Sequence, residues 1–239
     1  MRATKAIFKK EFKSTAANPE SLMMFIIYPA VAFVMTMLLD MDALPEDMRM
    51  AMPNLTTMMA AIFAGLSLIP VVSVIIARDI EKKSLRFLMM AGVKPAAYLI
   101  GIGGVIFFIS FLTSIAFAFI DGFSGAYFWI FTGTMMSGVT ASIILGGIIG
   151  ILTKSQQSAV AISTPLSMIL AFGPMIAQFN EGIARGLRFV YTQQINVVAN
   201  YLNAGITDNL WQSFIIMWAN VSILAVIFIF AYARRGLKD

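Results

Sequence analysis

The chain of 239 residues contains no cysteine and no histidine. Without cysteine it has no disulfide, no thiol nucleophile and no thiolate ligand for a metal ion. Without histidine it lacks the side chain that most often acts as a base near neutral pH and most often binds metals. We therefore expect no catalytic residue and no metal site in this chain.

Charge is also scarce, since 12% of the residues are charged and 59% are hydrophobic, whereas an ordinary soluble domain is about 25% charged. The long charge-free runs can each cross a hydrocarbon core of about 30 Å as a helix. We place the membrane-spanning helices at residues 21–39, 55–77, 98–120, 126–152, 158–179 and 210–233. The expected fold is an all-α membrane protein with six spans, in which residues 1–239 form a single transmembrane domain.

The predicted spans contain no Asp, Glu, Lys or Arg. Ion-coupled transporters usually keep such side chains within the membrane, at a cost of about 3 kcal/mol each, and an intramembrane hydrolase needs a base beside its nucleophile. Both classes of protein are therefore disfavoured, and an intramembrane enzyme is our third hypothesis, after the two given at the end of this section. If this protein moves a solute uphill, the energy comes from another subunit, and we expect no cofactor in this chain.

The basic residues are unevenly distributed. Segments 1–20, 78–97 and 234–238, together with Lys154, hold 14 of the 17 Lys and Arg. The opposite connections hold most of the acids: Asp40, Asp42, Glu46, Asp47, Asp121, Glu181 and Asp208. The positive-inside rule then places both termini in the cytoplasm of a bacterial cell, with the spans in its inner (plasma) membrane. The same asymmetry explains the net charge of +5 without a nucleic-acid partner.

The first 20 residues form a basic, amphipathic segment. Ile7, Phe8 and Phe12 share one face of a helix predicted over residues 4–17, and Lys9 and Lys13 lie off that face. Such a helix lies along the inner leaflet, and we expect Phe8, Lys9, Phe12 and Lys13 to be its interfacial residues, in contact with lipid. The alternatives are a solvated basic tail and a signal peptide. The first apolar run is long for a signal peptide, and no A-x-A site follows it.

The segment RDIEKKSLRFLMMAGVKP, residues 78–95, interrupts the apolar sequence. Asp79 is a suitable N-cap for a helix that begins at Ile80, Gly92 can end the helix, and Pro95 prevents its continuation. The segment therefore predicts a short cytoplasmic helix over residues 79–92 with one apolar ridge. Such a helix either lies on the membrane or inserts its ridge into a groove of a soluble partner.

Small residues recur every fourth position in the predicted fourth span, at Gly138, Ser142, Gly146 and Gly150. This stripe lets a neighbouring helix approach closely. We interpret it as packing within the chain, with a dimer seam as the alternative.

The fifth span contains Pro165 and Pro174, which predict a broken or re-entrant helix. The connection that follows it is long. We expect residues 180–209 to form a short helical hairpin at the outer surface, either as an external gate or as a plain structured loop.

Residues 81–101 resemble the first cytoplasmic loop of ABC-2 type transporter permeases. That loop typically has an acidic start, a Gly-Thr/Ser-Leu step, two apolar residues, a turn with proline, and an aliphatic pair with Gly-Lys that opens the third helix. The matching residues are Glu81, Ser84, Leu85, Leu88, Pro95, Leu99, Ile100 and Gly101. Lys83 replaces the common Gly, Ile102 stands where Lys is common, and the turn comes later in the chain. The order of the helices along the whole chain is also similar.

The resemblance implies a type V exporter-like architecture of two six-span subunits, the second being another copy or a paralogue, with two ATPase subunits that bind ATP and Mg²⁺. It implies that the loop helix, as a coupling helix, docks on the ATPase subunit through Glu81, Lys82, Ser84, Leu85, Phe87, Leu88, Met89, Gly92, Lys94 and Pro95. Lys154, Gln156 and Gln157 would form a second, smaller cytoplasmic contact.

We therefore interpret the chain as the membrane subunit of an ABC exporter that uses a separate ATPase. The expected cargo is amphipathic or hydrophobic, with an antimicrobial or toxin-like peptide, or a drug, as the best candidate. The main alternative is a non-transporting membrane subunit that anchors or senses a cytoplasmic partner.

Overall fold

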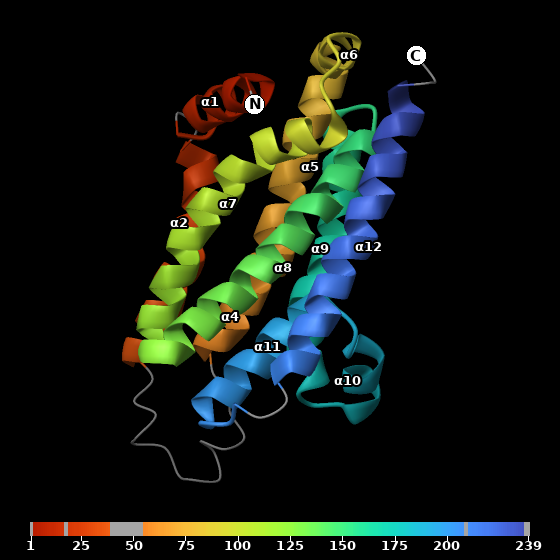
Figure 1. Ribbon diagram of the computed structural model, residues 1–239. Coiled ribbons are helices and arrows are strands. Elements are labelled where there is room, and N and C mark those ends of the chain that lie inside the picture. Colours follow the sequence, from red (N-terminus) through yellow and green to blue (C-terminus); the bar gives the residue numbers. More distant parts are fainter. Residues whose placement is uncertain (1, 17–18, 39–54, 208–209, 237–239) are drawn as a thin grey trace.

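The computed structural model describes residues 2–16, 19–38, 55–207 and 210–236, and these residues are predominantly helical (Figure 1). In chain order, the helices are α1 (Arg2–Ala16), α2 (Pro19–Leu38), α4 (Leu55–Ile62), α5 (Leu68–Glu81), α6 (Ser84–Met90), α7 (Pro95–Ile120), α8 (Gly125–Leu152), α9 (Gln156–Ala177), α10 (Glu181–Leu187), α11 (Tyr191–Asn203) and α12 (Leu210–Gly236). A π-helical turn, Phe63–Ser67, joins α4 to α5 and is called the π segment below.

Five helical stretches are long and apolar enough to cross a membrane. They are Leu55–Glu81, Ala96–Ile120, Gly125–Leu152, Gln156–Ala177 and Leu210–Arg234, and Leu22–Leu38 is a shorter apolar helix. All six regions overlap the predicted spans, and the all-helical class is confirmed for the described residues. Six spans as a count stays a prediction. Residue 39 and the acids at 40, 42, 46, 47 and 208 lie outside the described residues.

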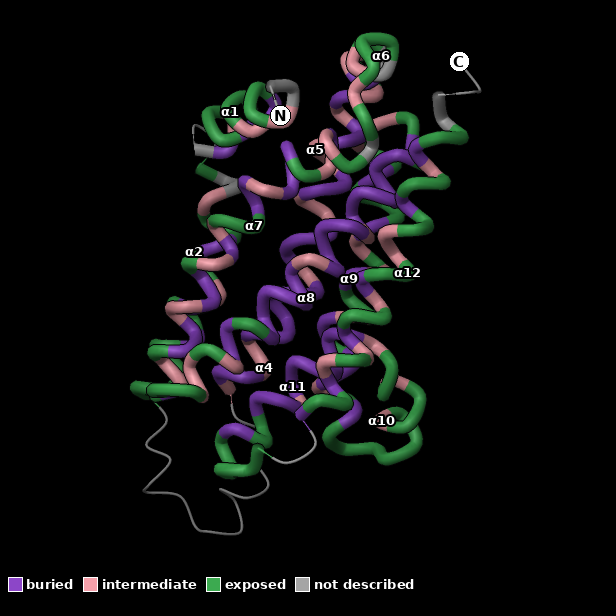
Figure 2. Tube along the Cα trace, viewed as in Figure 1, coloured by how far each residue is buried: buried purple, intermediate pink, exposed green. Residues whose placement is uncertain are grey.

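The helix α8 lies at the centre of the molecule and is buried along most of its length (Figure 2). A β-carbon built on Gly146 would lie 2.7 Å from the carbonyl oxygen of Ile69, and one on Gly150 would lie 2.8 Å from that of Ser73. One on Gly138 would lie 2.5 Å from the side chain of Ile195 in α11. The small-residue stripe therefore meets α5 and α11 of the same chain.

The prediction of a broken or re-entrant fifth span was wrong, because α9 is a continuous helix with both Pro165 and Pro174 inside it. A proline removes one backbone donor, and the other hydrogen bonds of a long packed helix still hold it together. The segment that follows folds into two short helices, α10 and α11. They lie at the opposite end of the molecule from α1, α6 and the end of α12 (Figure 1).

The helix α1 packs against α7, the third predicted span. A β-carbon built on Gly101 would lie 2.7 Å from the side chain of Ile7, and one on Gly104 would lie 3.3 Å from the ring of Phe8. Ile7 is buried, and Phe12, which stacks on Phe8, is 44% exposed. The apolar face of α1 is therefore used largely within the chain. Among the residues expected to face lipid, Lys9, Phe12 and Lys13 are exposed and Phe8 is half-buried.

The prediction of one helix over residues 79–92 was wrong. The helix α5 continues through Glu81, a turn at Lys82 and Lys83 interrupts the helix, and α6 runs from Ser84 to Met90. Lys83 has φ 57° and Gly92 has φ 74°, so a left-handed residue bounds α6 at each end. Asp79 is not an N-cap but a buried residue in the last turn of α5. The helix α7 then begins at Pro95.

Candidate functional site

Asp79 lies 3% exposed at the base of α6 and accepts hydrogen bonds from three helices. Its Oδ1 accepts from Lys10 Nζ of α1 and from Ser84 Oγ of α6, each at 3.0 Å. Its Oδ2 accepts from the buried hydroxyl of Tyr98 in α7, also at 3.0 Å. One carboxylate therefore joins the end of α5 to α1, α6 and α7.

Glu11 of α1 forms the second half of this arrangement. It is 1% exposed, and Arg78 Nη2 donates to its two carboxylate oxygens at 3.3 and 3.0 Å. Lys10 Nζ also lies 3.2 Å from Glu11 Oε1. We call Lys10, Glu11, Arg78 and Asp79 the charge cluster. The cluster contains two carboxylates and two cationic side chains, so that each buried carboxylate has a cationic partner.

The charges of the cluster affect the ammonium group of Lys10. Partial burial alone lowers the pKa of Lys10, but the charges of Asp79 and Glu11 and their hydrogen bonds outweigh burial and raise the pKa above its usual value. Lys10 therefore stays protonated at neutral pH, as the buried carboxylate of Asp79 requires.

Sequence reasoning missed Glu11 altogether and gave Asp79 a different role. A signal for Glu11 exists, because it is the only acid in the predicted helix over residues 4–17. It also lies four residues after Ile7, which places it on the face that packs against α7.

The apolar residues of α6 divide into an inner and an outer set. Leu85 is 3% exposed and Leu88 is half-buried against the core. Phe87 and Met90 are each 67% exposed. Lys82, Gly92 and Lys94 of the expected docking residues are exposed as well, and the side chains of Met89 and Pro95 are not among the described ones. The surface that α6 offers to another molecule is therefore centred on Phe87 and Met90.

The two predicted contact regions meet at Glu81 and Gln156. Both the backbone N–H and the side-chain amide of Gln156 donate to Glu81 Oε2, at 3.3 and 3.0 Å. Lys154 and Gln157 are exposed beside them. The loop after α6 is also held, because Tyr232 of α12 donates its hydroxyl to the carbonyl oxygen of Val93 at 3.1 Å. The base of α6 is therefore bonded to α1, α7, α9 and α12.

The described residues form no group of three or more acidic side chains that could hold a metal ion. The arrangement can transmit movement from one helix to others. It presents a short, partly apolar helix at the end of a long span, and polar bonds tie that helix to the surrounding helices. A partner that pushes on α6 would act on all of them.

A model of the ABC-2 type transporter family matches residues 2–211. The chain belongs to the ABC-2 type transporter family. The match covers α1 to α11 and the start of α12, which includes the charge cluster and α6. The search of curated proteins finds no significant match.

Membership makes the chain a multi-pass membrane protein and the permease component of an ABC transporter. Permeases of this family normally work with an ABC ATPase subunit, in which the ATPase activity lies. The family predicted from residues 81–101 is thereby confirmed.

Proposed function

We propose that this permease exports an amphipathic or hydrophobic substrate, and that an ABC ATPase subunit drives it by docking on α6. The observation that carries this proposal is the division of α6, whose inner residues fix the helix to the permease and whose outer residues, Phe87 and Met90, are exposed. Exposed apolar side chains on a short helix are typical of a helix that inserts into a groove of a partner.

The basic residues support the proposed orientation. The start of α1, the helix α6 and the end of α12 lie at one end of the molecule (Figure 1), and they belong to segments 1–20, 78–97 and 234–238, in which Lys and Arg are concentrated. The positive-inside rule makes this end cytoplasmic in a bacterial plasma membrane, where an ATPase subunit can reach α6. The other end, with α10 and α11, then faces outward.

The charge cluster would carry the movement of α6 into the membrane. Because Asp79 bonds to α1, α6 and α7 at once, a displaced α6 would move these helices together. The bond between Glu81 and Gln156 would add α9. ATP and Mg²⁺ bind to the partner in this scheme, and none of these residues carries out chemistry.

The exposed faces of two helices and the uncharged spans support the proposed path and cargo. A second copy or a paralogue would cover part of the apolar surface of α9 and α12, because only 33% and 17% of the residues in their most apolar stretches are buried. The cargo would then pass along the seam between the two subunits. Because the expected spans contain no charged side chain, we propose an apolar or amphipathic cargo, such as a peptide or a drug.

The docking of α6 is tested with Phe87→Asp and Met90→Asp. An aspartate at either position puts a charge into the proposed contact while it leaves the buried Leu85 in place. We expect each variant to purify as a folded protein and to lose at least about tenfold of the co-expressed ATPase subunit, because a buried unpaired charge costs several kcal/mol. The measurement is the amount of ATPase subunit that copurifies with the tagged permease.

Phe189→Asp is the matched control, because Phe189 is also 67% exposed but lies at the other end of the molecule, between α10 and α11. It should leave ATPase copurification unchanged. Full ATPase binding by Phe87→Asp and Met90→Asp would disprove docking on α6. Binding that is lost without any effect on export would favour the alternative, an anchor or sensor subunit.

A further inference from the structure

The π segment interrupts the second span at Phe63–Ser67, with regular helix on both sides. A π turn shifts the hydrogen-bond register and leaves a backbone carbonyl available to a side chain. Here Ser142 Oγ of α8 donates to the carbonyl oxygen of Ala64 at 2.7 Å. The contact is shielded from bulk solvent, because both residues are fully buried.

Ser142 also bonds to the outer helix α11, since its Oγ lies 2.8 Å from the hydroxyl oxygen of Tyr191. A serine hydroxyl has one proton, and the proton of Ser142 is used on Ala64. The hydroxyl of Tyr191 is therefore the donor to Ser142. The result is a directed chain of hydrogen bonds from α11 through α8 to the π segment.

The helix α11 is unusual because it buries polar side chains. Thr192 Oγ1 and Gln193 Oε1 are buried without a hydrogen-bond partner among the described residues. Gln194 Nε2 donates to the carbonyl oxygen of Arg188 at the end of α10, a bond within the segment that follows α9. The other polar bonds of α11 to the membrane-spanning helices are long, with 3.4 Å from Asn196 Nδ2 to the Pro174 carbonyl oxygen and 3.4 Å from Asn203 Nδ2 to Thr57 Oγ1. Unpaired buried groups disfavour this closed position, so the short bond of Tyr191 is the strongest polar contact between α11 and these helices.

We propose that Ala64, Ser142 and Tyr191 form a latch that keeps α11 closed over the end of the bundle. The latch depends on the π segment, because a return to regular α-helix would give the Ala64 carbonyl a backbone donor four residues on and leave Ser142 free to turn away from Tyr191. The helix α5 connects this segment to α6. The latch needs no partner protein; its use in transport rests on the proposed function, in which movement of α6 and α5 would release α11 on the outside.

The absence of cysteine permits a direct test. Ala199 of α11 is fully buried, and Ala199→Cys places one thiol beneath the closed helix. We expect slow reaction with a bulky polar maleimide in the purified protein in nanodiscs. Adding Tyr191→Phe or Ser142→Ala should each increase the labelling rate up to about tenfold, because each removes the hydrogen bond between Tyr191 and Ser142 and raises the open population. Ser142→Ala also removes the bond to the Ala64 carbonyl oxygen.

Tyr201→Phe is the matched control, because it removes a phenol hydroxyl from the same helix at a position that is 39% exposed and should leave the rate unchanged. The double variant Tyr191→Phe with Ser142→Ala should react no faster than the quicker single variant, because both break the same chain. Labelling of Tyr191→Phe at the rate of Tyr201→Phe would overturn the latch, as would effects that multiply in the double variant. Neither result depends on an ATPase subunit, so the docking of α6 is tested separately.

Discussion

At the scale of single residues, Asp79 is the side chain on which the arrangement around α6 depends most. Asp79→Ala leaves the buried hydroxyl of Tyr98 and the ammonium of Lys10 without this acceptor. Lys10 is 55% exposed and can turn toward water, so we expect a loss of about 2 kcal/mol in unfolding free energy, mainly from Tyr98. The measurement is thermal unfolding of the purified permease in detergent.

Glu181→Ala is a suitable control for Asp79→Ala, because Glu181 pairs with Arg185 at 3.3 Å but both side chains are more than 80% exposed. Removal of such a surface pair should change stability by less than about 0.5 kcal/mol. Asp79→Asn, which keeps an acceptor for Tyr98, should fall between the two. Equal unfolding temperatures for Asp79→Ala and Glu181→Ala would show that the charge cluster does not stabilise the fold.

The residues of the charge cluster show where sequence reasoning stops. Helix periodicity placed Ile7 and Phe8 on one face of α1, and both meet glycines of α7. The partner of a charged residue depends on how helices far apart in the chain are arranged, and periodicity contains no such information. Lys10 and Asp79 are 69 residues apart. Asp79 was therefore given the local role of a cap, which any acid before a helix could fill.

At the scale of the element, the close approach of α5 and α8 gives a prediction with opposite signs at two glycines. A β-carbon at Gly146 would lie 2.7 Å from a backbone oxygen of α5, whereas one at Gly133 would meet nothing within 4 Å. Gly146→Ala should destabilise the permease by about 1–3 kcal/mol through overpacking. Gly133→Ala should stabilise it by about 0.5–1 kcal/mol, because alanine loses less backbone entropy in a helix.

Thermal unfolding of the two glycine variants in the same detergent checks this pair. Because both changes add one methyl group to α8 and both reduce the backbone entropy lost on folding, the difference between the two variants reports packing. If both variants were stabilised, the α5–α8 contact would be looser than the 2.7 Å approach requires.

The turn between α5 and α6 was predicted only in part, because the sequence pattern indicated helix in this region but not the turn within it. The capping pattern predicted one helix from Ile80, but Lys83 adopts φ 57° and splits the segment. That conformation costs a residue other than glycine about 1 kcal/mol, and the hydroxyl of Ser84, which bonds to the carbonyl oxygen and the carboxylate of Asp79, helps to hold the turn. Lys83 stands where Gly is common in the loops that this segment resembles. The family pattern therefore indicates a turn at this position, whereas the helix propensity of the local sequence does not.

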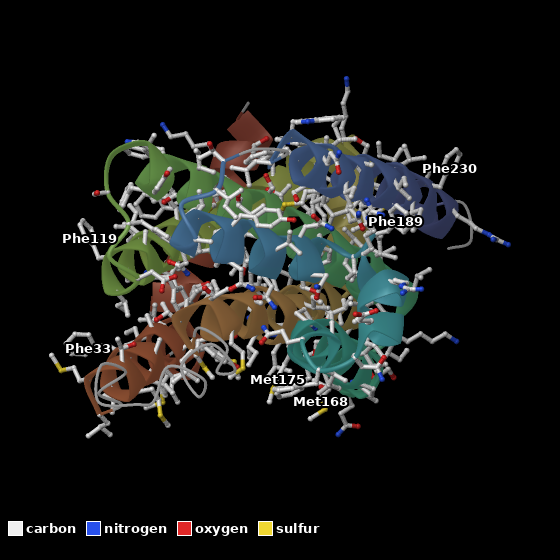
Figure 3. All side chains as sticks on the ribbon, turned by 90° about the horizontal axis from the view of Figure 1, so that it is seen from below. Phe33, Phe119, Met168, Met175, Phe189 and Phe230 are labelled. Carbon is white, nitrogen blue, oxygen red and sulfur yellow. The ribbon has the colours of Figure 1, made fainter. Side chains whose placement is uncertain are left out.

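At the scale of the whole molecule, a belt of apolar side chains surrounds the helices. Phe33, Phe119, Met168 and Phe230 point outward from four different helices (Figure 3), and each is at least 46% exposed. In a membrane such side chains face lipid or another subunit. Length and hydropathy were enough to predict the helices that carry this belt, because the length of a span depends on the thickness of the membrane and not on how the helices pack.

The orientation of the molecule gives the last prediction, which uses a matched pair of alanines. Ala91 follows α6, Ala204 follows α11, and both are exposed at opposite ends of the bundle. With Ala204→Cys, we expect intact cells to be labelled by a membrane-impermeant maleimide. With Ala91→Cys, labelling should require a permeabilised membrane, because the positive-inside rule predicts that the end with the basic segments is cytoplasmic. The parent chain has no cysteine and gives the background. Labelling of Ala91→Cys in intact cells would place α6 outside, where no ATP-hydrolysing subunit could drive it.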